Sequence, residues 1–95
     1  MAFVQIMDFH ASDIDGLQKA NDEWRAATEG KRTLRREIVA RDRNDPSHYV
    51  VLAFFDSYES AMENSALPET QASAEQFASL TENMVFVDLD VIDEH

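Results

Sequence analysis

Two internal histidines, His10 and His48, are the side chains whose protonation changes nearest to neutral pH. A histidine held by a carboxylate is a common general base in enzymes. Asp8 and Asp13 lie close to His10 in the sequence, so either carboxylate is a candidate partner. The sequence therefore makes His10 the candidate catalytic base, and a solvated loop histidine is the alternative.

Other kinds of reactive site have little support in the sequence. The chain contains no cysteine, which excludes disulfides, thiolate metal sites and thiol nucleophiles. Asp88 and Asp90 share one face of a predicted strand, but no histidine accompanies them and hard cations need several more oxygen ligands. The only glycines are Gly16 and Gly30, so no glycine-rich phosphate loop is present. We therefore expect no metal and no cofactor.

Composition indicates one folded domain spanning residues 1–95. Hydrophobic residues make up 44% of the chain and charged residues 28%, which is typical of a globular domain. The net charge of −11 argues against a nucleic-acid partner, because binding to phosphates requires a basic surface. The N-terminus lacks the features of a signal peptide, and no apolar run reaches the roughly 20 residues that span a bilayer. We expect a cytoplasmic protein without a membrane partner.

Hydrophobic periodicity predicts the element order β-α-β-β-α-β. The expected elements are a strand at 3–9, a helix at 13–29, strands at 34–42 and 48–55, a helix from 57 that breaks at Pro68 and resumes to 80, and a strand at 83–92. This order is typical of an α+β, ferredoxin-like fold with an antiparallel sheet of order 4-1-3-2 and both helical segments on one face. We expect the strands at 3–9 and 48–55 to be parallel neighbours, which would place His10 and His48 at opposite edges of the sheet.

The pattern of the central strands also predicts a homodimer. The strands at 3–9 and 48–55 are apolar on both faces, whereas the helices cover only one face of the sheet. A second copy of the chain is the simplest cover for the other face. All the basic residues precede position 44 and the second half is purely acidic. We therefore expect the edge with Arg35 and Arg41 to lie near the partner's acidic edge, which carries Asp88 and Asp90.

The segment Arg41–Ala61 carries a resemblance to a known family. Its acidic turn ends in Pro46, its strand ends in aromatic residues, and the following helix begins with a Glu-x-Ala pattern at Glu59. This segment resembles the central hairpin and helix start of the antibiotic-biosynthesis-monooxygenase-like, dimeric α+β barrel proteins, and residues 64–68 are similar to the segment that follows. The resemblance implies a dimeric barrel that acts as a cofactor-independent monooxygenase on an aromatic or quinol-like compound.

The haem-degrading signature of this superfamily is absent. Those members resemble one another in an asparagine on the first strand, a tryptophan ending the third and a histidine on the next helix. The corresponding positions here hold Met7 or Asp8, then Phe55 and Asn64. The missing helix histidine removes the haem ligand, so we expect no haem chemistry.

The resemblance implies a ligand cavity between the helices and the sheet. Its expected walls are Trp24, Phe55, Leu17 and Met62, with Asn64 as a catalytic polar anchor and His10 as the base. Two purely structural interpretations remain open. Trp24 is then a core residue whose indole N–H needs an acceptor, and Asn64 is an exposed residue at a helix end.

The alternative function is a non-catalytic small-molecule-binding or dimeric assembly module. In that case Met62, Phe77 and Leu80 would fill the space between the helices and the sheet. A cavity that reaches Trp24 or Asn64 distinguishes a ligand-binding protein from a fully packed one.

Overall fold

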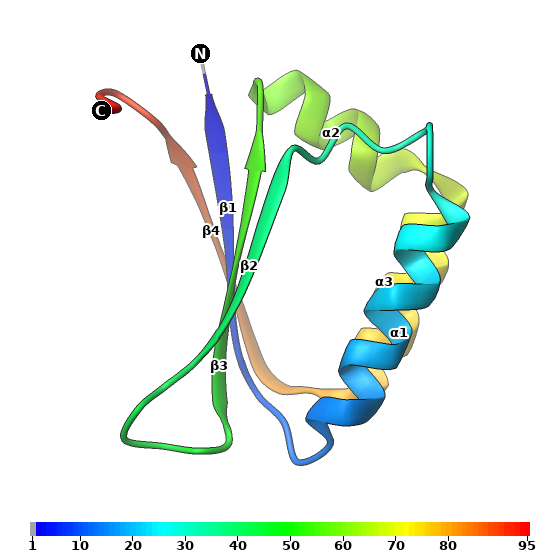
Figure 1. The fold of residues 1–95 in the computed structure, drawn as a ribbon, viewed down its shortest axis with the longest axis vertical. Coiled ribbons are helices and arrows are strands. Elements are labelled where there is room, and N and C mark those ends of the chain that lie inside the picture. Colours follow the sequence, from blue (N-terminus) through cyan, green and yellow to red (C-terminus); the bar gives the residue numbers. More distant parts are fainter. Residues whose placement is uncertain (1) are drawn as a thin grey trace.

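The computed structural model describes residues 2–95, in which a four-stranded sheet carries three helices on one face (Figure 1). The elements are β1 (Phe3–His10), α1 (Ile14–Ala27), β2 (Arg36–Arg41), β3 (His48–Phe55), α2 (Tyr58–Ala66), α3 (Pro68–Leu80) and β4 (Glu82–Asp90). The strand order is β2-β3-β1-β4. This topology confirms the predicted α+β, ferredoxin-like fold.

One detail of the predicted sheet is wrong, because β1 and β3 are antiparallel rather than parallel. Their register runs from Phe3 opposite Phe55 to His10 opposite His48. The cause is the topology: the crossover through α1 makes β2 run parallel to β1. Because β3 returns antiparallel to β2 after the connection 42–47, β3 is also antiparallel to β1. His10 and His48 are therefore cross-strand partners, and the expectation that they lie at opposite edges is corrected.

Local sequence signals fix where the helices begin. The Asp13 side chain accepts a hydrogen bond from the Gly16 N–H at 2.9 Å, so α1 begins at the next residue, Ile14. Ser57 and Ser60 form a reciprocal capping box at the start of α2. Pro68 opens α3, where its missing N–H costs nothing, and this confirms the predicted break between the two helical segments.

The core between the sheet and the helices consists of two clusters. One contains Phe9, Leu17 and Tyr49, near the start of α1. The other contains Phe3 and Phe55 at the opposite end of the sheet, against α2. In Figure 1, α1 and α3 lie over the middle of the sheet as a separate layer.

The opposite face of the sheet is apolar and has no helix over it. By strand alternation its apolar residues include Val4, Ile6, Ile38, Val50, Leu52, Phe54, Val85, Val87 and Leu89, and the polar residues Asp8, His10, His48 and Arg36 lie toward its ends. Val85, Val87 and Leu89 of β4 are exposed by 54%, 40% and 43%. Within the described residues, no helix is both long and apolar enough to cross a membrane.

Candidate functional site

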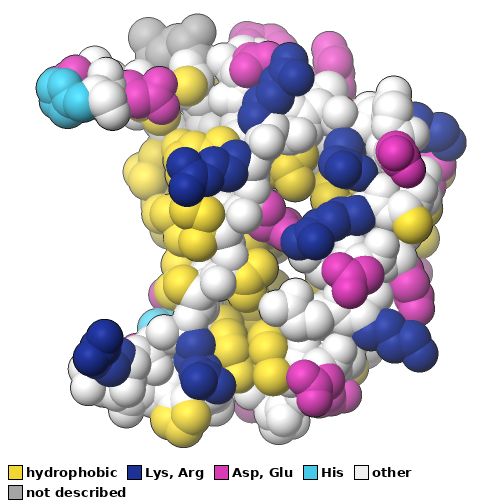
Figure 2. Space-filling model, in the orientation of Figure 1, with side chains coloured by type: hydrophobic (Ala, Val, Ile, Leu, Met, Phe, Trp, Pro, Cys, Tyr) yellow, Lys and Arg dark blue, Asp and Glu magenta, His cyan; other side chains and the backbone are white. Residues whose placement is uncertain are grey.

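A cavity of about 590 Å³ lies between the sheet and the helices. Ala53, Phe55 and Met7 belong to its sheet side, whereas α1 and α3 supply most of the opposite wall. Figure 2 shows the molecule hollowed between these two layers. This volume lies within the roughly 300–1,000 Å³ range of cavities that bind small molecules. Side chains therefore do not fill the interior completely, whereas the alternative with a packed interior requires that they do.

Trp24, a predicted wall residue, lines this cavity from α1. Its side chain is largely buried, and its Nε1–H donates a hydrogen bond to Thr70 Oγ1 on α3 at 2.9 Å. The guanidinium of Arg32 lies 5.9 Å from the centre of the ring. Trp24 thus finds the acceptor that a buried indole needs, and it joins α1 to α3 at the edge of the cavity.

Asn64, the predicted polar anchor, also lines the cavity and is buried rather than exposed at a helix end. Its Oδ1 accepts a hydrogen bond from the Thr33 N–H at 3.1 Å, which holds the amide in one orientation. Within residues 2–95, no hydrogen bond involves its Nδ2 atom. Asn64 therefore has a donor available for a molecule in the cavity.

The other predicted site residues lie elsewhere. Leu17 borders a separate, smaller cavity of about 60 Å³. Met62 packs against the cluster around Phe3 and Phe55 instead of lining the large cavity. His10 points to the opposite face of the sheet, because its neighbour Phe9 belongs to the core. The structure therefore brings Trp24, Phe55 and Asn64 together and leaves the other three residues apart.

Glu37 is a charged cavity residue that the sequence did not single out. It lines the cavity from β2, and its side chain is only 12% exposed. Its Oε1 accepts hydrogen bonds from Asn21 Nδ2 at 2.7 Å and from Arg25 Nη2 at 3.1 Å. Strand alternation puts Glu37 on the same side of β2 as Val39, which packs against the core cluster around Phe9. The alternation alone does not show which side of β2 faces the helices, so the sequence contains no clear signal for Glu37.

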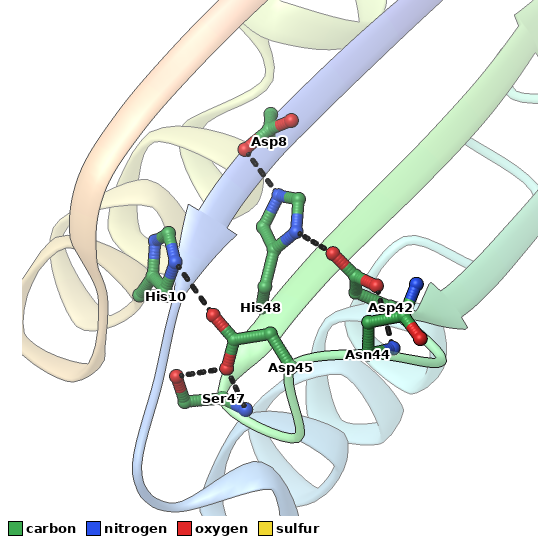
Figure 3. Close-up of polar contacts among 7 residues, drawn as sticks. All are labelled: Asp8, His10, Asp42, Asn44, Asp45, Ser47 and His48. Carbon is green, nitrogen blue, oxygen red and sulfur yellow. Dashed lines mark hydrogen bonds and ion pairs between the residues drawn. The ribbon is translucent and has the colours of Figure 1, made fainter.

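His48 is held between two carboxylates on the face of the sheet away from the cavity (Figure 3). Its Nδ1 lies 2.8 Å from Asp42 Oδ2, and its Nε2 lies 2.8 Å from Asp8 Oδ1. Ionised carboxylates only accept hydrogen bonds, so both contacts are satisfied when both ring nitrogens donate, which is the case in the imidazolium form. The hydrogen bonds to Asp42 and then to Asp8 raise the pKa of His48. The bond from His48 and the backbone N–H of Asn44 lower the pKa of Asp42.

The ring of His10 stacks on that of His48, with centroids 4.9 Å apart (Figure 3). The carboxylate nearest to His10 is Asp45, whose Oδ2 lies 3.5 Å from His10 Nε2. The predicted partners are both engaged elsewhere, because Asp8 binds His48 and Asp13 caps α1. That pairing is therefore corrected to Asp45. No set of three or more potential ligands in residues 2–95 is arranged to hold a metal ion.

The ion pairs of His48 predict a specific pH dependence of stability. Because the folded-state pKa of His48 is raised, its contribution is fully present below about pH 6.5 and is lost as the pH rises through the raised value. The lowered pKa of Asp42 has the opposite effect, so that contribution is present above about pH 3.9 and is lost as the pH falls through the lowered value. Urea unfolding across this range should show wild type losing stability relative to His48→Gln from neutral pH upward. Parallel stability profiles of the two proteins would contradict the assignment.

Comparison with solved structures finds the same fold in other proteins. SnoaB, a cofactor-independent oxygenase from Streptomyces nogalater, is 13% identical, with a TM-score of 0.83 over 98% of this chain and 95% of its own. A protein of Nitrosomonas europaea provisionally named an antibiotic biosynthesis monooxygenase is 12% identical, with a TM-score of 0.79 over 96% and 90% of the chains. Rv0793 from Mycobacterium tuberculosis is 15% identical, with a TM-score of 0.79 over 99% of this chain and 98% of its own.

The sequence alone finds no match, either to a family model or to a curated protein. The likeness is therefore one of three-dimensional structure, and it extends over nearly the whole chain. It agrees with the resemblance carried by the segment Arg41–Ala61. The chain has the fold of the antibiotic biosynthesis monooxygenase structures.

Proposed function

We propose that the chain binds a small hydroxylated aromatic or quinol-like compound in the 590 Å³ cavity and oxidises it with molecular oxygen. The observation that carries this proposal is the cavity itself, which reaches Trp24, Phe55 and Asn64 in a fold shared with a cofactor-independent oxygenase. The aromatic and aliphatic lining suits a flat ring system, and the few polar groups suit its oxygen atoms.

The proposed reaction uses the substrate itself as the reductant. With 1-naphthol as a model substrate, one oxygen atom of O₂ enters the ring, the other leaves as water, and the product is 1,4-naphthoquinone. Four electrons pass from the ring to O₂, and the hydroxyl proton and one ring proton leave with the water. The protein's part is to exclude bulk water with Trp24 and Phe55 and to orient a ligand oxygen through Asn64 Nδ2.

Oxygen uptake tests this function directly. We expect the protein to accelerate oxygen consumption by 1-naphthol, with one molecule of quinone formed for each O₂ consumed. Uptake that equals the rate without protein would contradict the catalytic proposal. Binding of 1-naphthol without uptake would support the second candidate, a non-catalytic binding protein.

One observation favours that second candidate. Two polar groups of the cavity are held by the protein: Glu37 Oε1 by Asn21 and Arg25, and the indole N–H of Trp24 by Thr70. His10, the predicted base, lies on the other side of the sheet. Catalysis would therefore depend on the substrate's own reactivity toward oxygen rather than on His10.

Asn64→Asp tests the proposed anchor. The aspartate keeps an oxygen for the Thr33 N–H but cannot donate to a ligand carbonyl. We expect affinity for 1,4-naphthoquinone to fall about tenfold, as for the loss of one buried hydrogen bond. Calorimetric titration measures the affinity, and urea unfolding checks that stability is retained. Unchanged quinone affinity would remove Asn64 from the binding site.

We also propose that the chain forms a homodimer through the uncovered sheet face. The support is the apolar character of that face, on which β4 alone exposes Val85, Val87 and Leu89. The predicted contact between the basic edge of one chain and the acidic edge of its partner has less support. Arg41, opposite buried Tyr49, and Asp88, opposite Gln5 of the cavity wall, lie on the helix-facing side. The dimer proposal therefore rests on the apolar face.

A further inference from the structure

Glu37 is the only ionisable residue among those that line the large cavity. It also borders the smaller cavity of about 60 Å³, so it lies where the two spaces adjoin. The remaining lining residues are apolar or carry neutral amides and hydroxyls. A ligand that occupies this space therefore meets one carboxylate and no other charge on the cavity wall.

The carboxylate of Glu37 is fixed by one of its two oxygens. Oε1 accepts from both Asn21 and Arg25, which lie one turn apart on α1. Within residues 2–95, Oε2 takes part in no hydrogen bond. A carboxylate oxygen in a largely apolar wall gains most from a hydrogen-bond donor, because such charge-assisted bonds are stronger than neutral ones.

The charged side chains around Glu37 are more exposed than Glu37 itself, at 46% for Arg25 and 71% for Asp22 against 12%. Arg25 is shared, because its Nη1 lies 3.5 Å from Asp22 Oδ1 while its Nη2 holds Glu37. These three groups together carry one net negative charge. An anionic ligand would approach the Glu37 carboxylate in a cavity where water screens the repulsion poorly, because that side chain is only 12% exposed, and this disfavours its binding.

Ser73 provides a second polar contact in the same cavity, from α3. Its Oγ is buried and makes no hydrogen bond with the described residues. Buried hydroxyls are normally paired, so this group also lacks the partner that a ligand oxygen would provide.

We propose that Glu37 determines the specificity of the cavity. Its free oxygen accepts a hydrogen bond from the hydroxyl of a neutral hydroxylated aromatic compound, and its charge excludes aromatic carboxylates of the same size. Ser73 receives a second oxygen of the ligand. This inference rests on the proposed function, since it requires that the cavity binds an aromatic molecule.

The test compares 1-naphthol with 1-naphthoate, which share one ring system and differ in charge at neutral pH. Calorimetric titration of the wild-type protein should show binding of 1-naphthol and at least about tenfold weaker binding of 1-naphthoate. Glu37→Gln should weaken the binding of 1-naphthol and strengthen the binding of 1-naphthoate, so that the preference for 1-naphthol over 1-naphthoate becomes smaller or reverses. Glu69→Gln is the matched control, because Glu69 pairs with Lys31 and does not line the cavity.

The outcomes separate this inference from the function on which it rests. Binding of both probes with equal affinity to the wild type would overturn the role of Glu37 and leave the ligand-binding cavity in place. The same applies if Glu37→Gln and Glu69→Gln give the same preference as the wild type. Failure of both probes to bind at all would overturn both proposals. The wild-type comparison needs no variant, so it decides the question even if Glu37→Gln does not fold.

Discussion

Replacement of Ala74 by tryptophan is expected to abolish binding of aromatic ligands while the fold is retained. Ala74 lines the cavity from α3 but is an exposed position on that helix. An indole at this position extends into the empty space and meets few packed atoms, so it occupies the volume that a ligand needs. We expect affinity for 1-naphthol to fall by more than about tenfold, because the loss of one ring's buried area costs at least about 1.5 kcal/mol.

Ala72→Trp is the matched control for this variant. Ala72 lies on the same helix and is exposed, but it does not line the cavity. Both variants add the same side chain, so any general effect of a surface tryptophan is common to the two. Equal loss of binding in both variants, or full binding in Ala74→Trp, would show that the ligand does not occupy this cavity.

Replacement of Val87 by aspartate is expected to convert the proposed dimer into a monomer. Val87 lies on the uncovered face of the sheet and is 40% exposed in the single chain. A carboxylate at the centre of an apolar interface would be buried without a partner, which costs about 3–5 kcal/mol and weakens association by about a hundredfold or more. Sedimentation velocity at micromolar concentration measures the change.

The control for the dimer places the same charge elsewhere. Ala72→Asp on α3 adds a carboxylate on the helix side, so it should sediment as the wild type does. A wild-type protein that is monomeric at high concentration would contradict the dimer. A Val87→Asp protein that remains dimeric would show that another surface carries the association.

The sequence predicted the elements and part of the cavity because those features depend on local patterns. Alternation in β4, the break at Pro68 and the amphipathic spacing around Trp24 are all short-range signals. The direction of β3 relative to β1 depends on chain topology instead, and the wrong direction separated His10 from His48 in the prediction. The rings of His10 and His48 stack although the two residues are far apart in the sequence, so local patterns do not reveal this contact.

Apolar spacing also does not reveal whether a buried side chain meets a core or a cavity. Leu17 and Met62 have the same helical pattern as Trp24, yet both pack into core clusters. The difference depends on how the surrounding side chains fit together, which a pattern within one helix does not contain. Glu37 was overlooked for a related reason, because an inward charge on a strand is interpretable only once the space before it is known to be empty.

The most direct test of the account is the emission of Trp24, which is the only tryptophan of the chain and lies in the cavity wall. Titration with 5-hydroxy-1,4-naphthoquinone should quench this emission saturably, and the chain has no cysteine to react with the quinone. His48→Gln retains Trp24 and leaves the cavity unchanged, so it should give the same saturation curve. Linear, unsaturable quenching in both proteins would show that the quinone only collides with the surface, and it would contradict a ligand site between the helices and the sheet.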